Sequence, residues 1–531
     1  MTSLRIAFAA FTLAATVAEP ALAQSRVVAL SEHDENAYRA AFAAIEDHNF
    51  RAATSALARV DDDVLAPVVR GRMLLTQAYH ADWSAYTSWL NRYGDYGMAP
   101  AVYDRAMDSR SRRARRHGVT APSPVSGHGR TLPGTAPPVD GDSASDRAAL
   151  SRVADLIGSG DFDAARSLAQ TEVYGPRAGQ AQWQLGLIAY RLRDYAEAAR
   201  QFEASAQWEH HGGWARAAAH YWAARSLLAA GETRGVSAHF EAAAQMPWTF
   251  YGQLAEAQLG RDSALTFTAP ETDATTIQHF IEQHPAARRA AALAQLGRLS
   301  EAEAELRRLH SDLSQDDDRA FLALAVALQA PSAQLRAAEY GGPREAAGFC
   351  PATSFVPADG FTLDRALLYA IVRQESYFNP KAVSTSNARG LMQLLPSTAR
   401  DMDRSTNYRR APTALYDPNL NMALGQDYVQ WLMDQFHNDG DLGRLFASYN
   451  GGPGWLSRWL ATQPSDLDPL LVMEMMPREQ SRDYAERVLS HMTLCRKAFH
   501  QPTPELDHLA AGEPAIYTPL DHRGSGARPS S

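Results

Sequence analysis

The stretch GLIAYRLRDYAEAARQFEAS, residues 186–205, sets small and aromatic side chains at the offsets of two paired helices. Gly186 and Ala198 are small enough to let the helices approach closely. Tyr195 and Phe202 can then fill the gap between them. Because such a hairpin buries its apolar face only against neighbouring hairpins, the stretch predicts a longer helical array.

Two further helical pairs follow, at residues 217–245 and, more weakly, at 286–310. With 186–205 they resemble tetratricopeptide repeats, so we expect an α-solenoid over residues 148–349. Residues 24–108 are alanine-rich and predict an N-terminal helical region. The solenoid surface could hold a long ligand or a partner, or it could be a scaffold without a ligand of its own. The sequence leaves both open.

Two segments have the composition of chain that does not fold by itself. Residues 109–147 combine a basic run, SRSRRARRHG, with a stretch rich in Pro, Gly and Ser, and residues 501–531 are rich in the same three residues. Neither segment can bury enough apolar surface to fold, so we expect a linker or exposed loop and a disordered tail. The arginines of the basic run fit a solvated surface, with contact to an anionic glycan or lipid as the alternative.

Residues 1–23 have the pattern of a secretory signal peptide. Arg5 gives a positive start, an apolar run follows at 6–18, and Ala21-Leu22-Ala23 offers the small-x-small cleavage pattern. The apolar run is too short to span about 30 Å of hydrocarbon. We therefore expect cleavage before Gln24 and export to the periplasm, with no membrane span in the mature chain.

The overall composition restricts the partners and cofactors. The chain of 531 residues carries a formal net charge of −9, which argues against coating a nucleic acid by bulk attraction. His210-His211 cannot easily share an ion, because adjacent helical positions diverge by about 100°. We expect this pair at the surface and no metal site. The two cysteines, Cys350 and Cys495, could form a disulfide in an oxidising compartment or remain separate buried thiols.

Glu375 stands out in the stretch IVRQESYFNP, residues 371–380. Thr362 is the expected N-cap of a helix whose apolar stripe includes Leu367 and Ile371, and Glu375 falls on the same stripe. Asn379-Pro380 is expected to end this helix. An apolar setting and a helix C-terminus both disfavour a negative charge, so the pKa of Glu375 should rise. A carboxyl that is still protonated near neutral pH can protonate a leaving oxygen, as in the cleavage of a glycosidic bond. The alternative is a structural ion pair with Arg373 or Arg389.

Four motifs in order resemble the soluble lytic transglycosylase family. They are Glu375-Ser376, the GLMQ run at 390–393, Tyr449-Asn450 before a Gly-rich turn, and Pro477 followed by Arg482-x-Tyr484. The stretch DPNLNMALGQDY at 417–428 fits the same pattern. The resemblance implies an all-α chain, with an α-superhelix before a lysozyme-like catalytic domain at 350–500. The chain departs from the family pattern at Asn387, where a glycine is usual, and at Arg478 and Gln480.

The resemblance implies cleavage of the β-1,4 bond between N-acetylmuramic acid and N-acetylglucosamine in peptidoglycan, and it suggests exolytic action from strand ends. By this resemblance, Glu375 would act first as acid and then as base toward the muramic C6 hydroxyl, which would close a 1,6-anhydro ring. No cofactor is implied, and a monomer is expected, with peptidoglycan strands and cell-wall proteins as partners. Substrate-binding or supporting roles are implied for Ser384, Met392, Gln393, Tyr449, Asn450, Glu474 and Tyr484.

Within this set, Tyr449 is expected to hydrogen-bond near Glu375, and Glu474 to shape the opposite wall of the groove. Packing or turn formation is the alternative for several members, above all Met392. Two other functions stay open. A hydrolytic muramidase needs a second carboxylate, for which Glu474 is the candidate. A glycan-binding scaffold without turnover is the third reading, and the intact motifs argue against it.

Overall fold

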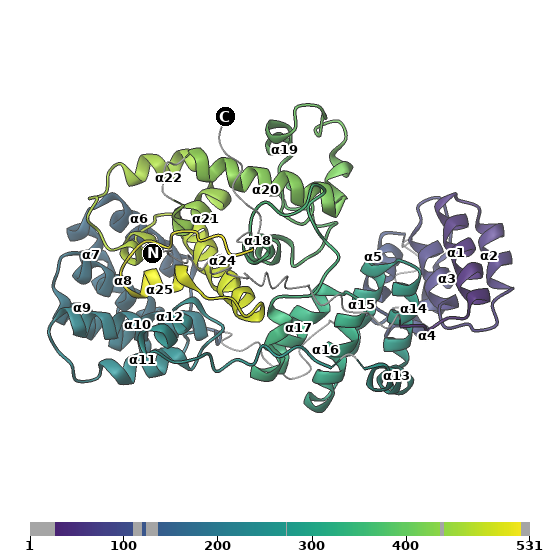
Figure 1. The fold of residues 1–531 in the computed structure, drawn as a ribbon, viewed down its shortest axis with the longest axis horizontal. Helices are drawn as coiled ribbons and strands as arrows, with labels where there is room; N and C mark the ends of the chain where they lie inside the picture. The colour runs from purple at the N-terminus through teal and green to yellow at the C-terminus, as the bar shows by residue number, and fades with distance from the viewer. Residues whose placement is uncertain (1–26, 110–118, 124–135, 272, 436–439, 522–531) are drawn as a thin grey trace, which may run out of the picture.

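The structure is a computed structural model that describes residues 27–109, 119–123, 136–271, 273–435 and 440–521. These residues form helices joined by turns, and the β-structure among them is limited to isolated bridges (Figure 1). No helix within these ranges is both long and apolar enough to cross a membrane. The predicted leader and most of the basic run lie outside the described residues.

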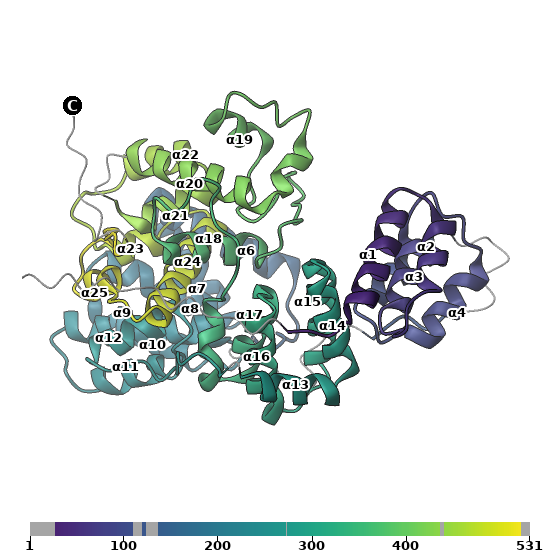
Figure 2. The ribbon, with the colours of Figure 1, turned by 45° about the vertical axis from the view of Figure 1, so that its right-hand side comes forward.

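The N-terminal helical region packs against helices that begin more than 160 residues after it ends. Tyr38 and Phe42 share a core with Phe280 and Leu306, and the Gln295 side chain bonds the backbone of residues 29 and 30. This region therefore lies beside α13–α15 at one end of the molecule (Figures 1 and 2). Its helices are α1 (Glu32–Glu46), α2 (Phe50–Leu57), α3 (Ala66–Leu75), α4 (Trp83–Tyr93) and α5 (Ala99–Asp108).

The solenoid prediction holds for the seven helices from α6 to α12. In the hairpin of α8 and α9, a Cβ atom on Gly186 would lie 2.7 Å from the Phe202 ring, which shows how closely the two helices approach. His211 was expected at the surface but is buried, with a ring nitrogen 2.9 Å from Ser205 Oγ. The helices are α6 (Ala144–Ser159), α7 (Phe162–Glu172), α8 (Ala178–Arg191), α9 (Tyr195–Ala206), α10 (Gly213–Ala229), α11 (Val236–Ala244) and α12 (Phe250–Gln258).

Helix α6 begins inside the predicted linker. The Ser143 side chain accepts a hydrogen bond from the Asp146 backbone, and the Asp146 side chain accepts one from the Ser143 backbone. This capping box starts the helix at Ala144, four residues before the predicted boundary. After the solenoid, a third group of helices includes the predicted pair at 286–310. Its members are α13 (Ala274–Gln283), α14 (Pro285–Gln295), α15 (Leu299–His310), η2 (Gln315–Asp317), α16 (Asp318–Ala327), α17 (Pro331–Gly341) and η3 (Pro343–Phe349).

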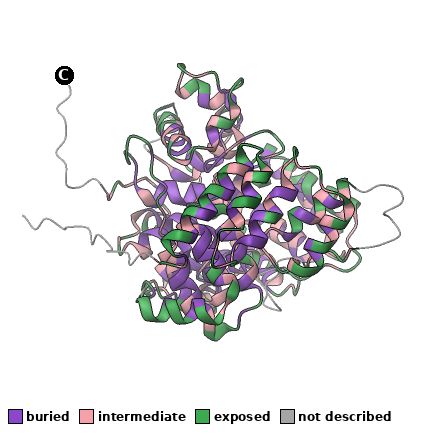
Figure 3. Cartoon of the chain, turned by 90° about the vertical axis from the view of Figure 1, so that its right-hand side faces the viewer, coloured by how far each residue is buried: buried purple, intermediate pink, exposed green. Residues whose placement is uncertain are grey.

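The C-terminal region shares one continuous hydrophobic core with the solenoid. Helix α24 lies within this core, where its buried residues contact α12, α18 and α21. Figure 3 shows buried residues on the inward faces of the helices and exposed residues on the outward faces. The helices are α18 (Arg365–Ser376), α19 (Pro396–Met402), η4 (Pro412–Tyr416), α20 (Pro418–Gln435), α21 (Leu442–Gly451), α22 (Pro453–Leu460), α23 (Pro469–Glu474), α24 (Glu479–Ala498) and α25 (Pro504–Ala510).

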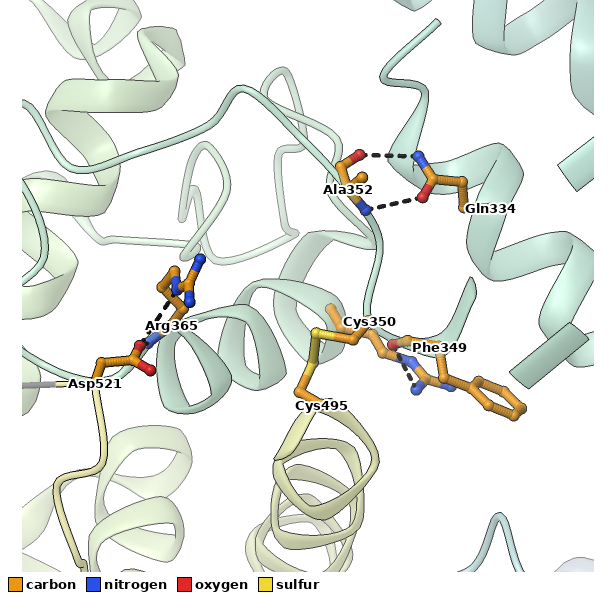
Figure 4. The surroundings of a disulfide bond; sticks show 8 residues. Gln334, Phe349, Cys350, Ala352, Arg365, Cys495 and Asp521 are labelled. Atoms are coloured by element: carbon orange, nitrogen blue, oxygen red, sulfur yellow. Dashed lines mark hydrogen bonds and ion pairs between the residues drawn. A yellow bond between two sulfur atoms is a disulfide. The ribbon is translucent and has the colours of Figure 1, made fainter. Parts of the chain in front are cut away.

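A disulfide joins Cys350, which follows η3, to Cys495 near the end of α24, with an S–S distance of 2.09 Å (Figure 4). The sequence left open whether these cysteines pair or remain separate thiols, and in the structure they pair. The bond closes a segment of 145 residues. It therefore links the start of the C-terminal region to α24 covalently.

The expectation of a disordered tail is wrong for residues 501–521. Pro504 occupies the first turn of α25, where a missing N–H costs nothing, so this proline starts a helix. Glu505 forms an ion pair of 2.7 Å with the buried Arg496. The backbone N–H groups of Leu520 and Asp521 donate to the Asp364 carboxylate. These long-range contacts stabilise a segment whose composition suggested disorder.

Candidate active site

Glu375 lies in the last turn of α18, on the helix face predicted from its periodicity. Leu367 and Ile371 on the same face are fully buried. The helix stops because Tyr377 and Phe378 adopt left-handed backbone, with φ of 53° and 60°, so it ends before Asn379-Pro380. The acid therefore sits at an open helix end, between the core and a cleft.

The N-terminus of α18 differs from the prediction. The N-cap is Asp364 rather than Thr362, and no side chain caps the helix there. The Asp364 carboxylate instead accepts hydrogen bonds from the 520–521 backbone and lies 3.3 Å from Arg496. The cap position was chosen from local sequence, whereas the residues that engage Asp364 come from more than 130 positions later.

The electrostatic surroundings of Glu375 are those of an acid near neutral pH. Burial raises the pKa of this half-buried carboxyl to about 7, and a hydrogen bond from Tyr484 opposes the rise. The two arginines that could have paired with it are engaged elsewhere. Arg373 lies 3.4 Å from Glu339, and Arg389 bonds Tyr416 and Asn387. Neither of these two arginines therefore holds Glu375 in a structural ion pair.

Two stacked tyrosines support the acid. Tyr484 of α24 donates a hydrogen bond of 2.7 Å to Glu375 Oε1. Its ring lies parallel to that of Tyr449 of α21, with centroids 6.2 Å apart. The Tyr449 hydroxyl donates to the Met392 carbonyl at 2.8 Å. Tyr484 thus makes the hydrogen bond to the acid itself, and Tyr449, which was expected to hydrogen-bond near Glu375, bonds a backbone carbonyl.

A loop after α18 presents polar groups to the same cleft. Gln393 Nε2 donates to the carbonyls of Ala382 and Gly390. Ser384 Oγ accepts from the Ala388 N–H at 3.0 Å, which leaves its own proton available to donate. Asn387 has φ of 66°, a left-handed conformation that asparagine tolerates better than most residues.

Met392 does not line the cleft. Its side chain is fully buried, and a Cβ atom on Gly425 of α20 would lie 2.2 Å from its sulfur. Its backbone N–H donates to Asn421 Oδ1 at 2.8 Å. Met392 is a core residue that fixes the loop against α20, so the prediction of a groove-lining side chain is wrong.

The cleft around Glu375 consists of two cavities. The larger, of about 800 Å³, is lined by Glu375, Ser384 and Gln393 and, from the solenoid side, by Trp214 and Trp248. The other, of about 470 Å³, adjoins Glu375 on the side of α24. Its lining includes Asn450, Tyr484, Glu479 and Asp483. The solenoid thus forms one wall of the cleft, which no local motif could have indicated.

Glu474 lies away from the acid. It is 4% exposed, accepts a hydrogen bond from Tyr251 of α12, and lies 3.7 Å from Arg482. It lines a third cavity, between the solenoid and α23–α24, in which Glu375 has no part. Glu474 joins the C-terminal region to the solenoid through Tyr251, and its expected role on the opposite wall of the groove stays a prediction. Among carboxylates, Glu339 shares the larger cavity with Glu375, and Asp483 and Glu479 share the smaller one.

Residues 353–469 match the family described as Transglycosylase SLT domain. The soluble lytic murein transglycosylase of Salmonella typhimurium is 36% identical over 136 residues, which are 25% of this chain and 20% of the relative. The Escherichia coli K12 protein of the same name is 35% identical over 136 residues, which are again 25% of this chain and 20% of the relative. Membrane-bound lytic murein transglycosylase C of Haemophilus influenzae is 31% identical over 134 residues, 24% of this chain and 37% of the relative. The match spans about a fifth of the length of the soluble relatives.

Two solved structures share the fold over most of the chain. The 70 kDa soluble lytic transglycosylase of Escherichia coli has a TM-score of 0.59 and 17% identity, covering 89% of this chain and 98% of that one. An inactive mutant of lytic transglycosylase Slt from Pseudomonas aeruginosa has a TM-score of 0.53 and 20% identity, covering 89% and 74%. These values extend the structural likeness beyond the matched domain to the helical regions before it.

Proposed function

We propose that this protein is a peptidoglycan lytic transglycosylase, on the premise that its residues 353–469 belong to the Transglycosylase SLT domain family. It cleaves the β-1,4 bond between N-acetylmuramic acid and N-acetylglucosamine and leaves 1,6-anhydro-N-acetylmuramic acid ends. The observation that carries the proposal concerns Glu375, a carboxyl at the cleft with a pKa of about 7 and no arginine partner among the described residues.

One carboxyl serves both halves of the reaction. Protonated Glu375 donates its proton to the bridging oxygen as the bond to C1 breaks. The resulting carboxylate removes the proton from the C6 hydroxyl of the same muramic acid, and that oxygen attacks C1. Protons balance, water is not consumed, and the carboxyl returns to its starting state. A pKa of about 7 suits a group that must both give and take a proton near neutrality.

The neighbouring groups orient the acid and the sugar. Tyr484 holds Oε1 of Glu375 through its hydroxyl, and Tyr449 stacks behind Tyr484. Burial and the nearby Glu375 raise the pKa of both tyrosines well above 10, so both remain neutral donors. Ser384 and Gln393, which line the larger cavity, contact the sugar or its acetamido group. No second carboxylate is required where the acetamido oxygen stabilises the positive charge at C1.

A hydrolytic muramidase is the second candidate, and one observation favours it. Asp483 lines the same cavity as Glu375 and could orient a water molecule. Its carboxylate lies 3.3 Å from Arg482, however, which holds it in an ion pair. Replacement by asparagine distinguishes the two functions. A lyase with Asp483→Asn still forms anhydro ends, whereas a hydrolase that depends on Asp483 loses its turnover.

Product analysis tests the proposal. Purified sacculi are digested with the wild-type protein and with Glu375→Gln, and the ends are identified by mass spectrometry. We expect anhydro-muramoyl ends from the wild type and almost no products from the variant. Reducing ends would show a hydrolase, and equal turnover by both proteins would exclude Glu375 as the acid. Glu513→Gln, an exposed glutamate away from the cleft, is the matched control.

We also propose that the protein acts in the periplasm, as a monomer, from the ends of glycan strands. The signal-like pattern at residues 1–23 and the disulfide between Cys350 and Cys495 both support an oxidising, extracytoplasmic setting. The solenoid wall formed by Trp214 and Trp248 restricts access to the cleft from one side, which favours a strand end. Release of small muropeptides before the mean strand length falls would support exolytic action, and the reverse order would contradict it.

A further inference from the structure

Two histidines face each other across consecutive helices of the solenoid. His220 lies in the middle of α10 and His239 near the start of α11, and their Nδ1 atoms are 3.0 Å apart. Both side chains are half-buried. Because the two residues are 19 positions apart and on different helices, no sequence motif connects them. The proposed reaction gives neither residue a role.

A carboxylate on a third helix fixes the tautomer of one ring. Oε1 of Glu203, on α9, lies 3.3 Å from Nε2 of His239 and accepts its N–H. With its proton held on Nε2, His239 turns the lone pair of its Nδ1 toward His220. A histidine that binds a metal through one nitrogen typically donates its other N–H to a carboxylate in this way. The carboxylate orients the ring and makes the ligand more basic.

The second ring is neutral at physiological pH. Burial, together with the charges of His239 and Arg216, lowers the pKa of His220 to about 4. In the metal-free protein Nδ1–H of His220 donates to Nδ1 of His239, so a single proton satisfies both nitrogens. A metal ion can replace this proton, which then moves to Nε2 of His220. The charge of Arg216 opposes a bound cation, and the Glu203 carboxylate offsets it.

The spacing of the two nitrogens selects the class of ion. Metal–imidazole bonds are about 2.0–2.1 Å long, so nitrogens 3.0 Å apart meet one ion at an N–metal–N angle of about 90°. This is the cis angle of square-planar or tetragonal coordination, which copper(II) and nickel(II) adopt. A tetrahedral zinc site would need the two nitrogens about 3.4 Å apart. Copper(II) is also the divalent first-row ion that nitrogen ligands bind most tightly.

We propose that His220 and His239 chelate a copper(II) ion through their Nδ1 atoms, with Glu203 as the residue that orients His239. Water completes the coordination. The ion bridges α10 and α11 directly and engages α9 through Glu203, so it holds together three consecutive helices that pack against one another (Figure 1). The inference is independent of the proposed function, because these three residues lie outside both cavities that Glu375 lines.

Titration of untagged protein with copper(II) tests the site, followed by calorimetry and by electron paramagnetic resonance. We expect one ion per chain and a spectrum with two equatorial imidazole nitrogens. His220→Gln and His239→Gln should each remove the two-imidazole signal. Glu203→Gln keeps both ligands and should weaken binding about 10–100-fold, as for the loss of a carboxylate behind a ligating histidine. Zinc(II) should bind the wild type at least about tenfold more weakly than copper(II).

Controls separate this site from other ligands and from folding. The ligand atoms of His33, Asp34 and Asp61 lie within 4.8 Å of one another, so His33→Ala is the matched control and should leave the copper affinity unchanged. Circular dichroism confirms that each variant is folded before its affinity is compared. The proposal is overturned if the wild type binds no stoichiometric copper or shows fewer than two imidazoles. Unchanged affinity in Glu203→Gln and His220→Gln, or tighter binding of zinc than of copper, would also overturn it.

Discussion

The Tyr484 hydroxyl of α24 donates a hydrogen bond of 2.7 Å to Oε1 of Glu375 at the end of α18. The two residues are 109 positions apart in the chain. The contact joins a helix that packs against the solenoid to the acid at the cleft. It also opposes the effect of burial on the acid, because a donor to a carboxylate favours the ionised form.

Tyr484→Phe should therefore raise the pKa of Glu375 above its value of about 7. A general acid must start protonated, so kcat/KM falls as pH rises through this pKa. We expect the alkaline limb of the kcat/KM profile to move up by about one pH unit and kcat to fall roughly tenfold, as for the loss of one hydrogen bond. Tyr449→Phe, which loses a bond to a backbone carbonyl instead, should move the limb much less. A limb that stays in place or moves down in Tyr484→Phe would contradict this role.

Glu375 should make the stability of the protein depend on pH. Its folded pKa is raised from 4.5 to about 7, so the fold favours the protonated form. The stability that the wild type gains from the protonated carboxyl is complete below the pKa of the unfolded state, and it is lost as pH rises through about 7. Glu375→Gln lacks this penalty, so its stability relative to wild type should increase between pH 5 and pH 8 by about 1–3 kcal/mol. Denaturant unfolding at both pH values measures the difference. A difference that is the same at pH 5 and pH 8 would count against the raised pKa.

The disulfide should stabilise the C-terminal region. It closes a loop of 145 residues, for which loss of chain entropy in the unfolded state predicts roughly 3–5 kcal/mol. We expect Cys350→Ser with Cys495→Ser to lower the Tm while folded protein still forms the same products. Reduction of the wild type should lower the Tm by a similar amount and leave the double variant unchanged. An unchanged Tm in both experiments would show that the bond is absent or energetically silent.

Gly390 should be intolerant of a side chain. Its φ is 79°, and a Cβ atom would lie 2.2 Å from the Leu415 carbonyl oxygen and 2.3 Å from the Asn421 amide. Gly390→Ala should therefore cost about 3 kcal/mol or more and disturb the loop that carries Gln393. Gly360→Ala is the matched control, because its φ is 84° but nothing lies within 4 Å of the added atom. It should cost only about 1 kcal/mol in backbone strain. Equal losses in chemical denaturation would contradict the steric argument.

Local periodicity was sufficient for the parts of the fold that depend on neighbouring residues. It identified the α8–α9 hairpin around Gly186 and Phe202, and it placed Glu375 on the buried face of α18. The type of side chain and its helical spacing determine these features. The raised pKa of Glu375 could also be predicted, because a carboxyl on a buried apolar face is disfavoured in its charged form.

Long-range contacts explain what the sequence did not predict. The Glu474 side chain accepts a hydrogen bond from Tyr251, which lies on a solenoid helix 223 residues away in the chain. The burial of Met392 depends on the close approach of Gly425. Order in residues 501–521 depends on Asp364 and Arg496. None of these partners lies within the range that a helical or turn pattern covers, so composition and local motifs could not reveal them.

The central claim is that Glu375 stays largely protonated until the pH approaches neutrality, and direct titration tests it. Carbon NMR of protein labelled at the glutamate carboxyl groups follows each carboxyl with pH, and Glu375→Gln identifies the signal by its absence. We predict a midpoint near pH 7 for this signal. A midpoint below about 5, the ordinary range for glutamate, would contradict the account.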